Sequence, residues 1–514
     1  MPPTLAANAE KALPDPQRWK ALVFISIAQL MVVLDATIVN IALPSAQQDL
    51  HISDANKQWV ITAYALAFGG LLLFGGRVAD LWGRKRTFVT GLIGFALASA
   101  IGGFAGNEAT LLGARAAQGA FGALLAPAAL SLLATTFTDA KEQIKAFGVF
   151  SAIAGGGGAV GLLLGGVLTE YLDWRWTFFA NIPFAVVAVL GAYLVIREPE
   201  GSRNQSPLDI PGVVLSTLGL VSLVYGFTRA ESAGWSSIST IGLFVAAAVL
   251  LATFVAVESK VRHPLLPMRV IADRNRGGSY LSLGLAIIGI FGVSLFLTYY
   301  LQVIQGYSAV KTGLAFLPLV VALIIASTQI GARLVNRLSA RALMAPGYAV
   351  AAIGILLFTQ LDVDSSYAGG ILPGLVLLGL GLGTAFTPGI ALSTNGVEPR
   401  DAGVASAMAN TSQQVGGAIG TALLNTVAAT ATTDYLASHV AGASDAKLLQ
   451  AQGLVHGYAH ATWWAVGIEA VAAVLALIFV TAGRPGTVKV DSSEGGDGPS
   501  DAGSAQDSVP VVLH

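Results

Sequence analysis

The sequence has no cysteine and few charged residues. Without cysteine among its 514 residues, it offers no disulfide framework, thiolate nucleophile or thiolate metal site. Charged residues make up only 11% of the chain, whereas a soluble protein has about a quarter. This shortage excludes an ordinary soluble protein, and we expect a polytopic membrane protein.

Motifs of ATP-driven pumps and membrane-embedded hydrolases are also missing. We find no zinc-type HExxH, no phosphate-cradling Gly-Lys-Ser/Thr loop and no pair of catalytic carboxylates within one apolar stretch. His439, His456 and His460 fall in a predicted outer loop without a matching carboxylate cluster, so we expect solvated side chains rather than metal ligands. We predict that the protein is not an enzyme and uses no cofactor or metal.

Long apolar stretches dominate the chain, because hydrophobic residues make up 54% of it and its mean hydropathy is +0.70. Stretches of roughly 18 to 24 such residues can cross a bilayer as helices. The predicted fold is therefore all-α, with about fourteen spans: 20–43, 58–78, 87–106, 110–134, 145–168, 176–196, 209–228, 237–257, 279–301, 312–334, 342–361, 369–393, 404–427 and 460–482.

The distribution of basic residues predicts the orientation. Loops assigned to the inside hold 22 of the 28 Lys and Arg residues, loops assigned to the outside hold five, and Arg115 lies within a span. Short positively charged loops stay on the cytoplasmic side. We therefore predict a multi-pass protein of the cytoplasmic membrane with both termini in the cytoplasm.

The order of the spans indicates an internal duplication. The stretch from Gly331 to Arg337 repeats glycine, arginine and an apolar residue of the stretch from Gly75 to Leu81, and an asparagine takes the place of its aspartate. Paired halves of this kind usually rock around a site at the midplane. The predicted domains are an N-terminal segment (1–19), a first six-helix half (20–196), a linker with two extra spans (197–278), a second six-helix half (279–482) and a disordered tail (483–514).

A short basic motif between two apolar stretches contains Gly75, Arg77, Asp80, Gly83, Arg84 and Arg86. Its glycines predict a tight turn, and Asp80 can pair with the neighbouring cations. The alternative is an ordinary positive loop that only sets topology.

Several signatures, in order along the chain, resemble the major facilitator superfamily, and within it the fourteen-span drug:proton antiporters of bacteria. They are the run from Leu34 to Pro44, the Gly75 motif, Arg115 to Gly119, Trp174 to Pro183 and Tyr299 to Gln302. The resemblance covers about residues 20–482. It implies two six-helix halves with two extra central helices.

The resemblance also implies two functional motifs. The Gly75 motif would be a cytoplasmic gate, held through Asp80, Arg84 and Arg86. The antiporter signature would be Gly157, Gly161, Gly165 and Gly166, although Leu162 replaces the usual proline and so removes a kink. The small residues allow helices to approach closely and make a dry seam between the halves; the alternative is simple helix packing.

Three charged side chains lie well inside spans, where each costs a few kcal/mol: Asp35, Arg115 and Glu469. Asp35 and Arg115 lie at compatible depths, roughly 12 and 8 Å from the outer ends of their spans. We hypothesise that Asp35 binds the coupling proton, that Arg115 modulates its proton affinity, and that Gln118 orients the guanidinium. The alternative is a permanent buried pair that only fixes helix register.

Glu469 is the third intramembrane charge. It is interpreted as a second proton carrier or as the counter-charge of a cationic substrate, with the faces of Trp463 and Trp464 available to that cation. Alternatively, the Glu469 side chain faces a polar groove and extends its carboxylate toward water.

Polar and aromatic side chains provide candidates for a substrate-lining surface. Asn410, Gln413 and Gln414 form a stripe at helical spacing that either lines a cavity or joins helices. The remaining candidates for an adaptable, greasy pocket are Asn40, Tyr64, Tyr299, Tyr300 and Gln302.

We therefore predict a proton-coupled exporter of drugs, antibiotics or other amphipathic organic compounds that works by alternating access. The alternative is a narrow-substrate metabolite exporter or an uncoupled facilitator of the same fold. The expected partners are the substrate, protons and the lipid bilayer, with no nucleic acid, and we expect a monomer.

Overall fold

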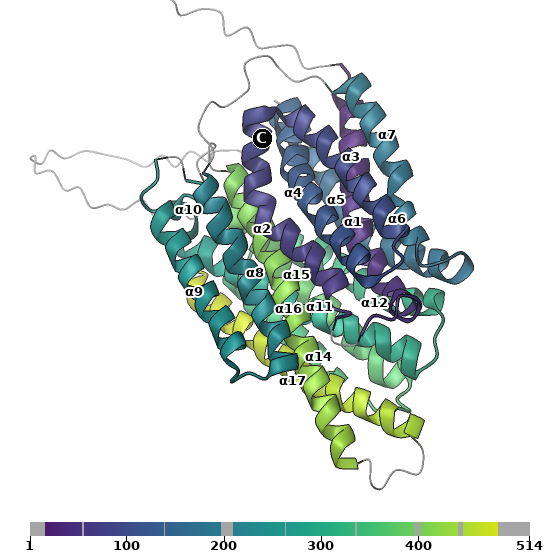
Figure 1. Cartoon of the computed structure of the whole chain (residues 1–514). Coiled ribbons are helices and arrows are strands. Elements are labelled where there is room, and N and C mark those ends of the chain that lie inside the picture. The colour runs from purple at the N-terminus through teal and green to yellow at the C-terminus, as the bar shows by residue number, and fades with distance from the viewer. Residues whose placement is uncertain are drawn as a thin grey trace, which may run out of the picture.

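The computed structural model describes residues 16–53, 56–137, 139–196, 209–262, 264–334, 337–394, 397, 402–439 and 446–481. These residues form helices and connections without any strand (Figure 1). The predicted tail lies outside the described residues, as does most of the predicted N-terminal segment.

The helices follow one another in chain order. They are α1 (Arg18–Asp49), α2 (Trp59–Trp82), α3 (Arg84–Gly103), α4 (Glu108–Thr136), α5 (Ala140–Tyr171), α6 (Trp176–Phe179), α7 (Asn181–Val195), α8 (Ile210–Ala233), α9 (Ile238–Glu258), α10 (Met268–Ile271), α11 (Arg274–Tyr299), η1 (Tyr300–Ile304), α12 (Ala309–Ile325), η2 (Ala326–Gly331), α13 (Ala332–Leu334), α14 (Ala340–Phe358), η3 (Tyr367–Ile371), α15 (Leu372–Thr394), α16 (Ala402–His439) and α17 (Ala446–Phe479).

Within the described residues, thirteen helical stretches are long and apolar enough to cross a membrane. Helix α5, with 32 residues, is also long enough to cross a membrane, so the number of spans is about fourteen. Helices satisfy their own backbone hydrogen bonds, as a bilayer interior requires. The predicted all-α polytopic fold is thus confirmed.

Short polar side chains define where many of these helices begin. The capping side chain accepts a hydrogen bond from a backbone N–H of the first turn, which would otherwise lack a partner. This cap occurs before α4, α8, α9, α11, α12, α14 and η3, at Asn107, Asp209, Ser237, Asp273, Ser308, Ser339 and Ser366.

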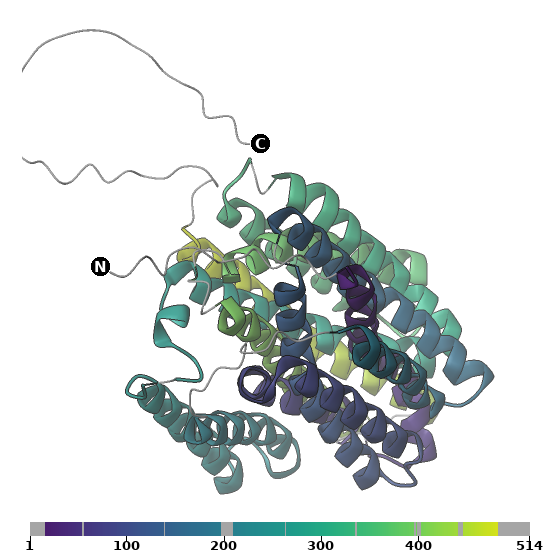
Figure 2. The same cartoon turned by 90° about the horizontal axis from the view of Figure 1, so that it is seen from above.

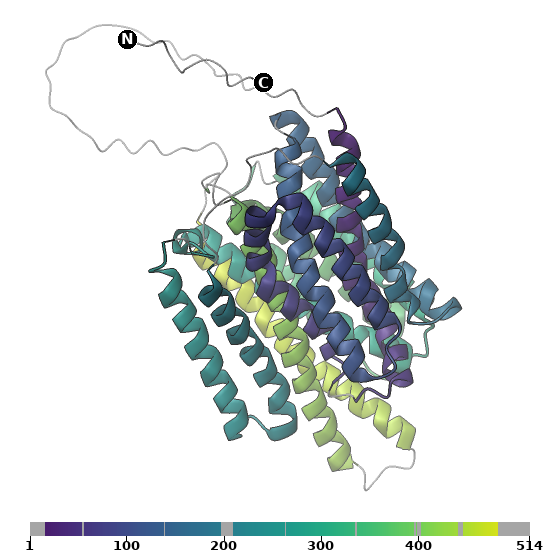
Figure 3. The same cartoon turned by 45° about the horizontal axis from the view of Figure 1, so that its top comes forward.

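The bundle has two ends, named here by the course of the chain. The terminal end is where α1 begins and α17 ends, and the far end carries the connection between α1 and α2 (Figure 3). One large apolar core is made of buried residues between Ala21 and Ile196, together with Ala407. Another is made of buried residues between Ala286 and Val480, together with Ile41. Helices α1–α7 and α11–α17 therefore each surround a core of their own.

Helices α8 and α9 form a pair at the edge of the bundle (Figure 2). Helix α8 contacts α16 and α2 and so attaches the pair to both sets of helices. For example, the Thr217 hydroxyl donates to the Gly70 carbonyl, and the Thr426 hydroxyl donates to the Phe227 carbonyl. The two extra spans therefore lie beside the main bundle rather than inside it.

Helices α16 and α17 are much longer than the spans predicted there. At 38 residues, α16 measures about 57 Å, well beyond the roughly 30 Å of a hydrocarbon core. The pair projects past the other helices at the far end (Figure 1). The prediction that His439, His456 and His460 lie in a loop is therefore wrong, because His439 is the last residue of α16 and the other two are inside α17.

Contacts between α16 and α17 explain why they continue as helices. Gly457 lies so close to α16 that a Cβ there would come within 2.5 Å of the Ala428 carbonyl oxygen. The Tyr435 ring stacks on His439 at 4.1 Å and also contacts the His456 ring at 4.8 Å. These contacts stabilise helical structure where composition alone predicts a loop.

The tight turn predicted for the Gly75 motif is also different in the structure. Helix α2 continues through Gly75 to Trp82, and α3 begins at Arg84. Gly83 alone makes the turn, with φ 109°, a conformation that favours glycine. Gly75 instead serves helix packing, since a Cβ there would lie 1.9 Å from the Ala123 carbonyl oxygen of α4.

Candidate functional site

A buried polar cluster lies at the centre of the first set of helices. Asp35 of α1 is completely buried, and Arg115 of α4 is 1% exposed. The Arg115 Nη1 donates to Asp35 Oδ2 at 2.7 Å and to Gln118 Oε1 at 3.0 Å. The structure thus brings together the three residues that the sequence predicts.

Two further side chains complete the cluster. The amide nitrogens of Gln118 and Asn181 donate to Asp35 Oδ1 at 2.9 and 2.8 Å. Both amides also donate to the Ser99 hydroxyl, at 3.0 and 2.9 Å, and this hydroxyl donates to the Phe178 carbonyl at 2.8 Å. Asp35 therefore accepts three hydrogen bonds, from residues on α4 and α7.

The Arg115 guanidinium is held on its other sides as well. Its Nε donates to the Val60 carbonyl of α2 at 2.8 Å, and its centre lies 4.4 Å from the centroid of the Tyr64 ring. A guanidinium over an aromatic face is stabilised by cation–π attraction. Tyr64, a candidate for the substrate surface, is buried here as part of the Arg115 surroundings.

The charges of the cluster balance. An ionised carboxylate and a guanidinium give it no net charge, and the neighbouring amides and hydroxyl complete its hydrogen bonds. Removing one partner of such a buried pair typically costs 3–5 kcal/mol, because the other charge is left uncompensated.

Hydrogen bonds at the far end join residues 20–196 to residues 279–482. Tyr299 donates to the Gln47 side chain, and Gln302 donates to the Ile41 carbonyl at 3.1 Å. Val310 N donates to Glu170 Oε2 at 2.8 Å. Within the described residues, Thr62 also bonds Thr421, and Asn425 donates to Gln58. All five lie toward the far end, so the two sets of helices are tied together there.

A cavity of about 280 Å³ lies at this far end. Its lining comes from both sets of helices and includes Gln47, Lys57, Tyr299 and Leu454. The Lys57 ammonium sits over the Tyr299 ring, 4.0 Å from its centroid. Tyr299 therefore borders the cavity at the far end and also contacts the first set of helices there.

Comparisons with known proteins agree with this architecture. The sequence profile of the Major Facilitator Superfamily matches residues 25–421. The chain belongs to this superfamily. The resemblance identified from the sequence motifs is thereby confirmed.

Two curated relatives of this superfamily member are named for antibiotics. The chain is 52% identical over 469 residues to the puromycin resistance protein pur8 of Streptomyces alboniger, covering 91% of this chain and 92% of the relative. It is 40% identical over 424 residues to the cephamycin export protein CmcT of Amycolatopsis lactamdurans, covering 82% and 87%. The chain is thus a multi-pass membrane protein similar to resistance and export proteins.

A solved structure shares the fold. It is a bacterial homolog of the human lysosomal transporter Spinster in an inward-facing, unoccupied conformation, with a TM-score of 0.63. It is 16% identical in sequence and covers 90% of this chain and 97% of that chain. At this identity the likeness shows the fold alone.

The glycine motif of α5 contacts two other helices, α1 and α12. Gly157, Gly161 and Gly165 face α1, where added Cβ atoms would lie 3.0 Å from Val33 Cγ1, 2.0 Å from Thr37 Oγ1 and 2.8 Å from the Ile38 carbonyl oxygen. Gly166 instead faces α12, with the Ala309 carbonyl oxygen at 2.8 Å. Gly166 therefore contacts the second set of helices, while the other three glycines pack within the first set.

We expect Gly161→Ala to lower the stability of the protein. The new methyl group would meet Thr37, whose hydroxyl already donates to the Val33 and Leu34 carbonyls. Overpacking of this kind costs about 1–3 kcal/mol. Thermal unfolding of the purified protein in detergent measures the effect.

Gly158→Ala is the matched control for Gly161→Ala. A Cβ at Gly158 has Thr37 Cγ2 at 3.9 Å, an ordinary contact. We expect this variant to keep or slightly raise the melting temperature, since alanine favours helix by about 1 kcal/mol over glycine. Equal melting temperatures for both variants would contradict the tight α1–α5 seam.

The charged residues of the Gly75 motif lie at the terminal end. Arg86 is exposed, while Arg77 and Arg84 are partly buried. The Asp80 side chain lies outside the described part of the structure, so its predicted ion pairs stay a prediction. Lys85 donates to the Ile196 carbonyl at 2.7 Å and so holds the end of α7, a contact that the sequence does not predict.

The remaining lining candidates have different surroundings. Gln413 donates to the Ala409 carbonyl of its own helix at 3.3 Å, and Gln414 Cβ faces Gly69 of α2. Asn40 donates to the Ala36 carbonyl at 3.4 Å, and Asn410 is exposed. Tyr300 donates to the Asp362 carbonyl and is buried among α11 and its neighbours.

Glu469 of α17 is completely buried. Trp463 and Trp464 are 57% and 52% exposed, so they lie on other faces of the helix. The tryptophan rings therefore do not surround this carboxyl group in the structure.

Proposed function

We propose that the protein exports antibiotics or other amphipathic organic compounds from the cell in exchange for protons. The two curated relatives described above support export, because one is named for antibiotic resistance and the other for antibiotic export. The identity to the puromycin resistance protein extends over 91% of the chain, so it includes both sets of helices.

The observation that carries the proton coupling is the buried pair of Asp35 and Arg115. A carboxylate and a guanidinium this far from water are costly to maintain and require a reason. Their 2.7 Å contact joins α1 to α4, so relative motion of these helices changes the proton affinity of Asp35. Such coupling of protonation to helix movement is what an antiporter needs.

The ties at the far end support alternating access. In this proposal the far end faces outside, as the distribution of basic residues predicts. The five hydrogen bonds between the two sets of helices then close the outer side, and they break when the halves rock. The Gly75 motif acts as the gate on the cytoplasmic side.

Substrate binding is assigned to polar side chains of α1 and of the first half of α16. Asn40, Asn410, Gln413 and Gln414 supply amide groups there, beside largely apolar helix surfaces. A mostly apolar site with few polar groups suits bulky amphipathic compounds. Glu469 is assigned to proton coupling.

The proposal predicts that export depends on the proton gradient. Cells that express the protein should extrude a fluorescent lipophilic cation and puromycin, and a protonophore should abolish extrusion while ATP is maintained. Fluorescence of the retained cation and intracellular puromycin measure the effect. Cells with empty vector are the control.

Two results would contradict this proposal. Export that continues after the gradient collapses would indicate an uncoupled facilitator. Failure to export either compound, with membrane insertion verified by accessibility labelling of an introduced cysteine, would favour a narrow-substrate exporter. The chain has no native cysteine, so such labelling is specific.

A further inference from the structure

The second set of helices contains a buried carboxyl group without compensation. Glu469 is fully buried, and neither of its carboxyl oxygens has a hydrogen-bond partner. Among the described residues no cation faces it. An isolated carboxylate in such surroundings costs far more than a neutral carboxylic acid.

A second polar group without a partner accompanies it. Tyr348 of α14 is fully buried, and its hydroxyl has no hydrogen-bond partner. Helix α14, which carries Tyr348, packs against α17, which carries Glu469. Two uncompensated polar groups from α14 and α17 therefore share one apolar region.

Gly289 of α11 forms the third side of this region. A Cβ there would lie 3.3 Å from Glu469 Oε2 and 3.2 Å from Ile355 Cδ1. The carboxyl group thus points toward the backbone of α11 between tightly packed neighbours. An organic cation could reach it only after rearrangement of three helices, whereas a proton needs no such space.

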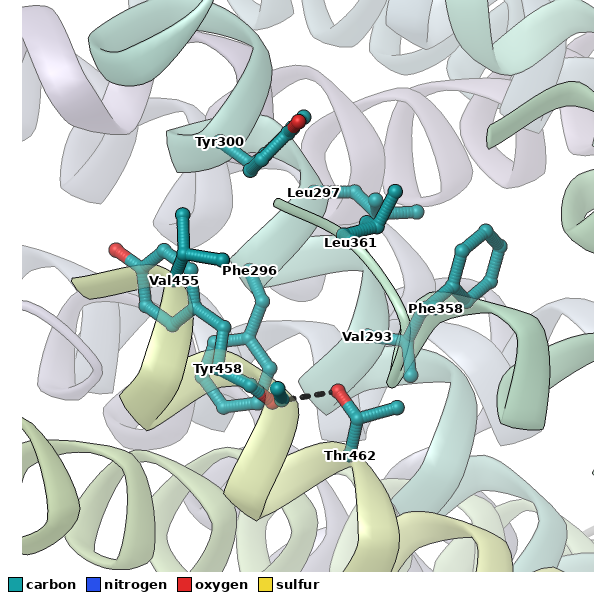
Figure 4. A pocket seen from close by; sticks show the side chains of 10 residues that line it. Val293, Phe296, Leu297, Tyr300, Phe358, Leu361, Val455, Tyr458 and Thr462 are labelled. Carbon is teal, nitrogen blue, oxygen red and sulfur yellow. Dashed lines mark hydrogen bonds between the residues drawn. The ribbon is translucent and has the colours of Figure 1, made fainter. Parts of the chain in front are cut away.

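A small cavity lies nearby on the same three helices. It measures about 20 Å³, enough for about one water molecule, and Val293, Phe358 and Thr462 are among the residues that line it (Figure 4). Along each helix these residues are farther toward the far end than Gly289, Ile355 and Glu469. The cavity therefore lies on the far-end side of Glu469.

We propose that Glu469 and Tyr348 form a second proton-binding site, separate from the Asp35 cluster. The proton binds a carboxyl oxygen of Glu469 and changes its charge from −1 to neutral. When the proton leaves, the Tyr348 hydroxyl donates to the carboxylate and stabilises it, so Tyr348 is a positioning residue. This inference rests on the proposed proton-coupled export and implies that each half carries one proton site.

The test is an infrared titration of the purified full chain in lipid nanodiscs, without substrate or gradient. The parent should show a protonated-carboxyl band at neutral pH that is missing in Glu469→Gln and retained in Asp35→Asn. A spectrum in which Glu469→Gln leaves this band unchanged would overturn the proposal. Because no transport is measured, failure of this site is distinguishable from failure of export.

Tyr348→Phe tests the positioning role and keeps Glu469 in place. Loss of a hydrogen bond to the carboxylate should raise the proton affinity of Glu469 about tenfold, so the band persists about one pH unit higher. Tyr193→Phe, at an exposed position of α7, is the control and should titrate like the parent. A midpoint unchanged in Tyr348→Phe would show that this tyrosine only fills space.

Discussion

Asp35→Asn is expected to reduce proton-driven export to the background of cells without the protein. Asparagine cannot exchange a proton, and its amide offers one acceptor oxygen where Asp35 accepts hydrogen bonds on two. Its NH2 group would therefore face one of the donors Arg115, Gln118 or Asn181. Export of the fluorescent cation from energised cells measures the loss.

The same substitution also affects stability, so export alone does not identify the role of Asp35. Arg115 would remain buried without its counter-charge, which typically costs 3–5 kcal/mol. The double variant Asp35→Asn/Arg115→Gln removes this charge imbalance. We expect it to regain much of the lost thermal stability and to remain unable to export.

The double variant separates coupling from a purely structural pair. If the pair only fixes helix register, removing both charges should restore export together with stability. Recovery of proton-driven export in the double variant would therefore contradict the coupling role. Asp434→Asn, at an exposed carboxylate of α16, is the control and should behave like the parent.

Gly75→Ala is expected to have the second large effect, a loss of about 3 kcal/mol or more in stability. The new Cβ would lie 1.9 Å from the Ala123 carbonyl oxygen and 3.0 Å from Leu124 Cα. These are backbone atoms of α4, so α2 and α4 would have to move apart. Thermal unfolding in detergent and the amount of folded protein in the membrane measure the effect.

The neighbouring glycine provides a sharp control. A Cβ at Gly76 would lie 3.6 Å from Pro127 Cβ, an ordinary contact. Gly76→Ala should therefore keep the melting temperature or raise it slightly, because alanine is the better helix former. A Gly75→Ala protein of normal stability that fails to transport would instead support a role of Gly75 in gate movement.

The depths of Asp35 and Arg115 within their spans were enough to predict that these two residues pair. Asp35 and Arg115 are uncommon charges inside apolar stretches, and opposite charges at similar depth have a strong reason to meet. Gln118 follows Arg115 by three residues, which places it on the same helix face. The structure brings all three together, although their role in transport stays a proposal.

Other members of the cluster carried no such signal. Ser99 and Asn181 are uncharged, and serine and asparagine inside helices commonly bond their own backbone. The sequence predicts Tyr64 on a substrate surface, but an aromatic residue in a span is compatible with several other roles. Which of these side chains face Asp35 depends on how α3, α7 and α2 rotate against α1.

The sequence by itself determined the membrane-spanning class, the number of spans and the family, because hydrocarbon length, charge scarcity and motif order are properties of the linear chain. Only the tertiary structure decided that Gly75 packs against α4, that α16 and α17 extend as helices beyond the other spans, and that Glu469 and Tyr348 are buried without hydrogen-bond partners. Those outcomes depend on close approach between helices distant in sequence, and the pattern within one helix does not specify which neighbour it meets.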